Sequence, residues 1–169
     1  MTRAHVVIPS PIGDLTVVAE DGAVTHLLMD AAKYRPDPEA FGEVGDLADE
    51  PFAAASVQLA AYFAGALTEF DLPLAPRGDD FHQRVWALLC EIPYGETRSY
   101  GQLARALGDR NLAQAVGTAN GRNPIAVVVP CHRVIGADGS LVGYAGGLAR
   151  KRYLLALEEP PADQSGRLF

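Results

Sequence analysis

The chain is poor in cysteine, has no long apolar run and carries fewer basic than acidic side chains. Its two cysteines, Cys90 and Cys131, are too few for a four-thiolate metal site, and a disulfide is unusual in a reducing compartment. The apolar stretches at 52–67 and 125–129 are too short or too interrupted to cross a bilayer about 30 Å thick. The N-terminus lacks the apolar block and cleavage site of a secretory signal. We therefore expect a soluble, cytoplasmic protein with no membrane partner.

The overall composition is that of a folded domain. The 169 residues are 49% hydrophobic and 21% charged, and the formal net charge is -7. These values exclude a disordered tail protein, a collagen-like repeat and a coiled coil. At this length, one compact domain or two small ones can bury an adequate core.

The N-terminal third has the pattern of a small sheet followed by a helix. Apolar and polar residues alternate over the first thirty positions, with turn residues at 9–14 and 21–22, which predicts a three-stranded antiparallel meander. Residues 30–51 are rich in proline, glycine and acids, and so form a connector. The Ala-rich segment 52–67 predicts an amphipathic helix, and 71–78 a second connector.

From residue 80 onward the pattern changes to short helices. We expect helices at 81–92, at 100–107 with Ser99 as the N-cap, and at 111–120. The last two, separated by a glycine-containing turn, have the spacing of a helix-turn-helix, but many helical hairpins bind nothing. After them we expect a strand over the apolar run 125–129, a Gly-rich hairpin at 135–147 and a final helix at 148–158.

Charge is divided unevenly between the two halves. Residues 1–77 contain 4 basic and 12 acidic side chains, whereas residues 78–158 contain 9 basic and 7 acidic ones. Eight of the basic residues lie between positions 98 and 152: Arg98, Arg105, Arg110, Arg122, Arg133, Arg150, Lys151 and Arg152. Such a cluster indicates either a phosphate-binding surface or an ordinary solvated face.

The two cysteines have different surroundings. Cys90 lies in a helical apolar pattern, so we expect a small buried apolar residue. Cys131 follows the apolar run and Pro130, and precedes His132 and other polar groups, a setting that favours a thiolate. Spacing alone leaves three roles open for Cys131: nucleophile, buried bystander or metal ligand. On an extended segment His132 could reach the sulfur only through a bend or a bridging water.

The segment from Asn123 to Ile135, NPIAVVVPCHRVI, is followed by GYAGGL at 143–148 and LLALE at 154–158. This combination resembles the O6-alkylguanine-DNA alkyltransferases, the methylated-DNA-protein cysteine methyltransferases. The resemblance covers about 81–158, and the N-terminal meander with its helix is similar to the family's first domain. It implies an α+β fold, with a ribonuclease H-like α/β domain at 1–78 and a mainly helical DNA-binding and alkyltransferase domain at 79–169.

The resemblance also implies roles for individual residues. Cys131 would accept the alkyl group, and His132, held by Glu158, would take the thiol proton through a water molecule. Tyr100 would help rotate the target nucleotide and would donate a proton toward guanine. Asn123 would be the hinge between the recognition helix and the active-site strand.

Further residues would form the base pocket and the DNA interface. The pocket would use the backbone carbonyls of Cys131 and Val134 together with Tyr144, Ala145, Gly146 and Gly147. The DNA contacts would include Thr118, Ala119, Arg122 and Arg133. Gln114 would fill the gap left by the flipped nucleotide, although it departs from the family pattern, which has an arginine in that place. Glutamine brings no charge and less stacking surface, so flipping would be less efficient.

The implied reaction is stoichiometric DNA repair. The thiolate would displace guanine from the alkyl carbon, and the resulting thioether cannot be hydrolysed, so each molecule would act once and would need no cofactor. The partner would be double-stranded DNA containing O6-alkylguanine, with the base flipped out of the duplex. We expect a monomer in solution. We also expect no zinc, because residues 1–80 contain no cysteine.

Two other functions remain open: a sensor that binds alkylated DNA without repairing it, and a cysteine hydrolase using Cys131, His132 and Glu158. The sequence does not specify the alkyl size, the activity on O4-alkylthymine or cooperative assembly on DNA.

Overall fold

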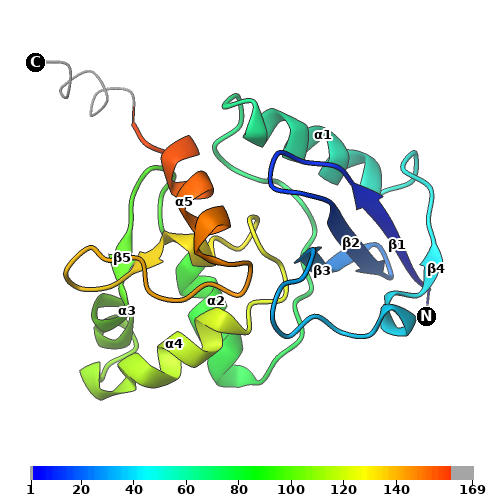
Figure 1. Ribbon diagram of the computed structural model, residues 1–169. Coiled ribbons are helices and arrows are strands. Elements are labelled where there is room, and N and C mark those ends of the chain that lie inside the picture. Colours follow the sequence, from blue (N-terminus) through cyan, green and yellow to red (C-terminus); the bar gives the residue numbers. More distant parts are fainter. Residues whose placement is uncertain (1, 161–169) are drawn as a thin grey trace, which may run out of the picture.

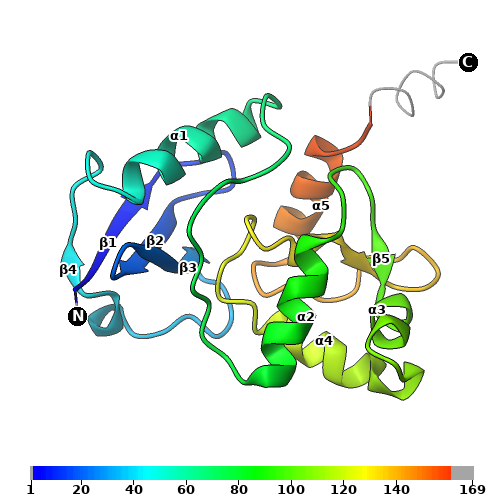
Figure 2. The same ribbon diagram turned by 180° about the vertical axis from the view of Figure 1, so that it is seen from behind.

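The structure, a computed structural model, describes residues 2–160. An N-terminal sheet with one covering helix lies beside a mainly helical C-terminal part (Figure 1). Seen from behind, the segment after helix α1 runs between the two parts to the start of helix α2 (Figure 2). The α+β class expected from the sequence is confirmed. Within residues 2–160, no helix is long and apolar enough to cross a membrane.

The predicted meander is formed by β1 (Arg3–Ile8), β2 (Leu15–Glu20) and β3 (Ala23–Met29). Both neighbouring pairs are antiparallel. The sheet nevertheless has four strands, in the order β3-β2-β1-β4. The fourth, β4 (Glu43–Val44), pairs in parallel with β1. It is only two exposed residues long, too short to produce an alternating pattern, and so the sequence did not indicate it.

Helix α1 (Phe52–Phe63) lies across the sheet (Figure 1). Its buried side chains are Phe52, Ala55, Leu59 and Tyr62, which recur at helical spacing and form the face toward the sheet. The helix ends four residues before the predicted boundary. The turn at Gly65, where φ is +78°, favours a glycine and stops the helix.

The C-terminal part contains the predicted short helices. Helix α2 (Asp80–Cys90) starts at an N-cap, Asp79, whose carboxylate accepts a hydrogen bond from the His82 amide. Helix α3 (Tyr100–Ala106) starts at Ser99 with a complete capping box. Gly108, at φ +102°, allows the turn after α3.

The remaining elements of this part follow the turn after α3. The 3₁₀ helix η2 (Arg110–Leu112) leads into α4 (Ala113–Gly121), which packs against α3 and α2. The helix-turn-helix spacing is therefore present in the structure. The chain then forms the 3₁₀ helix η3 (Cys131–Arg133), β6 (Val134–Ile135), which pairs with β5 (Arg98–Ser99), and α5 (Leu148–Leu157).

Three local predictions were wrong. Cys90 is exposed, because the last residue of α2 lies beyond the buried face formed by Val85, Trp86 and Leu89. Residues 125–129 form turns and one isolated bridge rather than a strand. Residues 135–147 form a loop without a strand pair after β6: Gly136 and Ser140 close a tight turn, but no antiparallel ladder continues from it.

The two parts share one apolar core and are joined by backbone hydrogen bonds. The Leu27 amide of β3 donates to the Pro124 carbonyl at 2.9 Å, and the Ala126 amide donates to the Leu27 carbonyl at 3.1 Å. The buried apolar cluster runs without a break from the sheet to α2, α4 and α5. The segment just before Cys131 is thus supported by the edge of the N-terminal sheet.

Candidate active site

Cys131 is the first residue of η3 and follows a compact buried turn. Its side chain is 6% exposed. The Asn123 side chain ties this turn: its amide donates to the Val129 carbonyl at 2.7 Å, and its oxygen accepts from the Ile125 amide at 3.0 Å. Val127, at φ +71°, takes a conformation that β-branched residues rarely adopt, so the surrounding contacts must enforce it. Asn123 therefore links α4 to a turn, not to the predicted strand.

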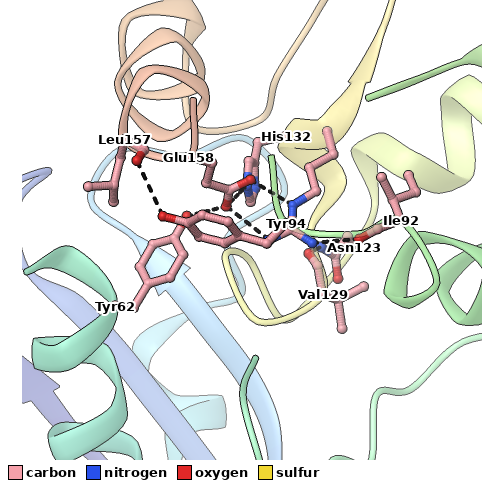
Figure 3. A network of polar contacts seen from close by, with 9 residues as sticks. Tyr62, Ile92, Tyr94, Asn123, Val129, His132, Leu157 and Glu158 are labelled. Atoms are coloured by element: carbon pink, nitrogen blue, oxygen red, sulfur yellow. Dashed lines mark hydrogen bonds and ion pairs between the residues drawn. The ribbon is translucent and has the colours of Figure 1, made fainter. Parts of the chain in front are cut away.

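His132 and Glu158 form a buried pair next to Cys131. The His132 Nε2 atom lies 2.7 Å from Glu158 Oε2, and both side chains are almost fully buried. Glu158 accepts further hydrogen bonds from the Tyr62 hydroxyl at 2.5 Å and from Arg133 Nε at 2.7 Å (Figure 3). The sequence-predicted partners are thus brought together across 26 residues.

The protonation states of the pair follow from its surroundings. Burial alone would raise the pKa of Glu158, but hydrogen bonds from His132, Arg133 and Tyr62 hold it at about 2. Because the ionised carboxylate can only accept, His132 Nε2 must donate to it. Burial also lowers the pKa of His132, so the imidazole is neutral and Nδ1 carries the lone pair. That Nδ1 atom is buried and has no hydrogen-bond partner within residues 2–160.

The thiol of Cys131 is neutral at rest. Burial raises its pKa, while the Asn123 amide, the charge of Lys151 and the Tyr144 hydroxyl act in the opposite direction. The Tyr144 hydroxyl is buried and makes no hydrogen bond of good geometry within the described residues. The sulfur therefore needs a base to become a thiolate, and the surrounding groups stabilise that thiolate once it forms.

A cleft of about 430 Å³ opens onto Cys131. Met29 and Trp86 contribute apolar walls. Asn123 and Tyr144 also line the cleft and interact with the thiol of Cys131. A smaller adjoining cavity of about 160 Å³ is bounded by Tyr100, Gly117 and Tyr144. Together these spaces are large enough for a flat heterocycle and an alkyl group next to the sulfur.

Tyr100 begins α3 at the mouth of the smaller cavity. Its hydroxyl donates to the Val142 carbonyl at 2.8 Å. Burial and the nearby Cys131 raise the pKa of Tyr100, so the phenol keeps its proton at neutral pH. The hydroxyl is thus a proton donor positioned beside the cleft.

The loop before α5 forms the opposite wall, where the sequence predicts Ala145, Gly146 and Gly147. A Cβ atom at Gly146 would lie 2.5 Å from the Met29 sulfur, so only glycine fits there without a shift of that side chain. Gly147, at φ +92°, allows the chain to enter α5. Ala145 and Gly146 line the cleft.

The predicted DNA contacts divide into two groups. Gln114, Thr118 and Arg122 are exposed on and after α4, as a DNA interface requires. Ala119 is fully buried, and its carbonyl accepts a hydrogen bond from Trp86 Nε1. Arg133 is 7% exposed and its guanidinium binds Glu158 and the Ile92 carbonyl. The burial of these last two side chains argues against their predicted contacts with DNA.

The basic cluster is likewise smaller than its sequence indicated. Lys151 is fully buried, and its Nζ atom donates to the carbonyls of Val142 and Gly143. Arg150 donates to carbonyls of Ile12 and Asp30 in the N-terminal part. Six arginines of the cluster remain partly or fully exposed: Arg98, Arg105, Arg110, Arg122, Arg150 and Arg152.

Two contributors to the site were not identified from the sequence. Tyr62 lies 96 residues before Glu158, and no local pattern connects them. The basic character of Arg133 was visible, but not its partner. Within residues 2–160, no group of three or more His, Cys, Asp and Glu side chains could hold a metal ion, and the absence of zinc stays a prediction.

Comparison with known families gives two matches along the chain. The model described as "6-O-methylguanine DNA methyltransferase, ribonuclease-like domain" matches residues 5–76. The model described as "6-O-methylguanine DNA methyltransferase, DNA binding domain" matches residues 80–160. Between them they include every residue of the site described above.

Individual relatives match over nearly the whole chain. A protein of Mycolicibacterium paratuberculosis named methylated-DNA--protein-cysteine methyltransferase is 53% identical over 162 residues, covering 96% of each chain. The crystal structure of Mycobacterium tuberculosis O6-methylguanine methyltransferase has a TM-score of 0.84 at 52% identity and covers 94% of this chain and 93% of its own. A structure of the Mycobacterium tuberculosis protein in complex with DNA has the same TM-score and identity, with 92% of each chain covered.

Proposed function

Because the chain belongs to the 6-O-methylguanine DNA methyltransferase family, we propose that it repairs DNA by moving an alkyl group from O6 of guanine to the sulfur of Cys131. Transfer from methylated DNA to a protein cysteine is the activity that its relatives' names give. One observation carries the assignment to Cys131: a buried thiol directly precedes a neutral histidine that is paired with an ionised glutamate. The division into domains at 1–78 and 79–169 is part of the same proposal.

Activation begins with proton transfer from the thiol. The free lone pair of His132 Nδ1 takes the proton of Cys131 through a bridging water molecule. The carboxylate of Glu158 accepts from Nε2 and stabilises the imidazolium that forms. Arg133 and Tyr62 keep that carboxylate ionised and fixed in position. The products of this step are a thiolate at Cys131 and a positive charge on His132.

The thiolate then attacks the alkyl carbon. A carbon-sulfur bond forms as the bond between that carbon and O6 breaks, and the bonding electrons pass to the guanine. Tyr100, whose phenol is protonated, donates a proton toward the base as this negative charge develops. The product at Cys131 is a thioether, which offers water no carbonyl to attack. Each molecule therefore reacts once.

The target base must leave the duplex to reach Cys131. Extrusion costs a few kcal/mol, and less for a mispaired damaged base. Helix α4 presents Gln114 and Thr118 toward the DNA, with Arg122 at its end for a phosphate. Tyr144, Ala145, Gly146 and Gly147 would form the wall for the flat base, and the carbonyls of Cys131 and Val134 would accept hydrogen bonds from its amino group.

The decisive experiment is incubation with a duplex containing one O6-methylguanine, followed by intact-mass analysis. We expect one methyl adduct per molecule, mapped to Cys131 by peptide sequencing, and no adduct on a Cys131→Ser variant. The exposed Cys90 provides an internal control, because it should remain unmodified. Binding without an adduct would instead favour a damage sensor, and repeated turnover of simple esters would favour a cysteine hydrolase. Parallel reactions with O6-benzylguanine and O4-methylthymine would define the substrate range.

A further inference from the structure

Asn120 is a buried amide of α4 that the proposed reaction leaves without a role. The residue is 5% exposed and lines both the cleft beside Cys131 and the smaller adjoining cavity. Its Nδ2 atom donates to the backbone carbonyl of Cys131 at 3.3 Å. Its Oδ1 atom is also buried, but this oxygen has no hydrogen-bond partner within residues 2–160. One atom of the amide is thus bound to the backbone of the nucleophile, and the other is unpaired.

The hydrogen bond to Cys131 determines which atom of the amide is unpaired. A carbonyl oxygen can only accept, so the nitrogen of Asn120 must face it, and the atom left over is the oxygen. An unpaired acceptor in a buried place costs free energy, and most such atoms in native proteins are completed by a donor. In the wall of a cleft that binds a base, the base itself can supply that donor.

The backbone around Asn120 holds the residue in place. Trp86 Nε1 donates to the carbonyl of Ala119, directly before Asn120, at 2.8 Å. The Asn120 carbonyl accepts from the amide of Asn123 at 3.3 Å, which ties the end of α4 to the turn before Cys131. A side chain that is fixed before the base arrives loses little conformational entropy on binding.

O6-alkylguanine has one group that can pair with this oxygen. The N3 and N7 atoms of the base can only accept, and alkylation at O6 leaves N1 without a hydrogen. The amino group on C2 is therefore the only hydrogen-bond donor of the base. It has two hydrogens, and the hydrogen-bonded pair of Asn120 and Cys131 contains two acceptors, the Oδ1 atom and the backbone carbonyl. The pair can therefore bind both hydrogens of the amino group.

We propose that Asn120 is a substrate-binding residue that determines specificity, because its Oδ1 atom accepts a hydrogen bond from the C2 amino group of O6-alkylguanine. The inference rests on the proposed function of Cys131. A base that lacks this amino group, such as O6-methylhypoxanthine, leaves the oxygen unpaired and is disfavoured. Helix α4 thereby has two roles, since its exposed side chains face the DNA and its buried amide recognises the base in the cleft.

The test compares two lesions that differ only in the C2 amino group, O6-methylguanine and O6-methylhypoxanthine. Each is placed at the same position of a single-stranded oligonucleotide, so that no base has to be extruded from a duplex. With the protein in excess, the loss of the methyl group from the oligonucleotide is followed by mass spectrometry. The quantity compared between proteins is the ratio of the two second-order rate constants.

Three variants separate the oxygen of Asn120 from its nitrogen and from the rest of α4. Asn120→Leu removes both polar atoms and keeps a branched side chain. Asn120→Asp retains acceptor oxygens but loses the donor to the Cys131 carbonyl. Gln114→Leu removes an amide from an exposed position on the same helix and is the matched control.

We expect the unmodified protein to favour O6-methylguanine, and Asn120→Leu to reduce that preference about tenfold, because one hydrogen bond to the amino group is lost. Asn120→Asp should react more slowly with both lesions, because its carboxylate repels the Cys131 carbonyl, but it should keep the preference. Gln114→Leu should change both rates in parallel and leave the ratio as it is. An unchanged ratio in a folded Asn120→Leu protein would overturn the proposal.

The unmodified protein provides a second measurement that needs no substitution at Asn120. Equal rates on the two lesions would contradict the proposal even if Asn120→Leu failed to fold. If O6-methylguanine transferred no methyl group to Cys131, the proposed function itself would fail. The affinities of the two oligonucleotides, measured by fluorescence anisotropy, would then replace the rates, and a preference for O6-methylguanine that Asn120→Leu reduces would still support recognition of the amino group.

Discussion

The hydroxyl of Tyr62 lies 2.5 Å from the carboxylate of Glu158, although 96 residues separate them. Tyr62 belongs to the helix that covers the N-terminal sheet, and Glu158 caps the last helix. The carboxylate that orients His132 is thus held partly by the first half of the chain. This contact gives the N-terminal part a direct effect on the chemistry at Cys131.

Replacement of Tyr62 by phenylalanine should loosen the position of the Glu158 carboxylate and lower the stability of the fold. The substitution removes one donor from a buried carboxylate, and we expect a loss of about 1.5–3 kcal/mol in the free energy of unfolding. Urea unfolding at neutral pH measures it. Tyr153→Phe, at an exposed position on α5, should cost far less. Equal stability of the two variants would mean that the Tyr62 hydroxyl does not support Glu158.

The stabilising effect of Glu158 should depend on pH in a defined range. Its pKa falls from 4.5 to about 2 on folding. The ionised carboxylate therefore contributes stability above pH 4.5, and that contribution is lost as the pH falls from 4.5 toward 2. Its size is on the order of 3 kcal/mol. The difference in unfolding free energy between the unmodified protein and Glu158→Gln should accordingly shrink over this range. A constant difference from pH 7 to pH 3 would show that Glu158 does not have the lowered pKa.

Substitution of Arg133 should lower the stability of the fold and leave DNA binding unchanged, whereas substitution of Arg122 should do the reverse. Arg133→Met breaks a buried ion pair and should destabilise the fold by about 3–5 kcal/mol, without changing the salt dependence of binding to undamaged duplex. Arg122→Met should leave stability nearly unchanged but reduce the slope of log affinity against log salt by about one. Fluorescence anisotropy at several salt concentrations gives the slope. A reduced slope for Arg133→Met in folded protein would restore its predicted contact with DNA.

Gln114 is exposed on α4, and the family resemblance predicts an arginine in its place. We expect Gln114→Arg to tighten binding to duplex DNA or to speed repair of O6-methylguanine, because a guanidinium adds charge and stacking surface. Single-turnover rates on duplex and single-stranded substrates separate the two effects: an effect confined to the duplex indicates a role in base flipping. Unchanged rates and affinities in both would exclude any role for this position.

Features set by neighbouring residues were predicted well. The capping of α3 by Ser99 and the turns of the meander depend on a few adjacent side chains, and the structure contains them. The pair formed by His132 and Glu158 was expected from the family resemblance, since neither residue carries a local signal for the other. The buried pair in the structure agrees with that expectation.

The failures involve features that depend on tertiary contacts. The strand predicted at 125–129 is a turn in the structure. Ile125, Val127 and Val129 are buried there, and a buried turn has the same apolar composition as a buried strand. A turn forms because Asn123 binds the backbone on both sides of it. Lys151 has the sequence surroundings of a surface residue, and only the packing of α5 against the loop at 142–143 places it inside. The prediction that Cys90 is buried was wrong for the opposite reason. Cys90 follows the buried Leu89 in α2, and the rotation of the helix by one residue turns its side chain away from the core.

The hydrogen bonds between Leu27 and the turn before Cys131 also bear on aggregation through the edge of the N-terminal sheet. Strand β3 is an outer strand, and such edges can recruit a strand from another chain and so start aggregation. Residues 124–126 and 73–75 occupy backbone groups of Leu27 and Val24 along this edge. The opposite edge is the two-residue β4, which is too short to template a long ladder. The contacts that support the nucleophile thereby also cover backbone groups along this edge of the sheet.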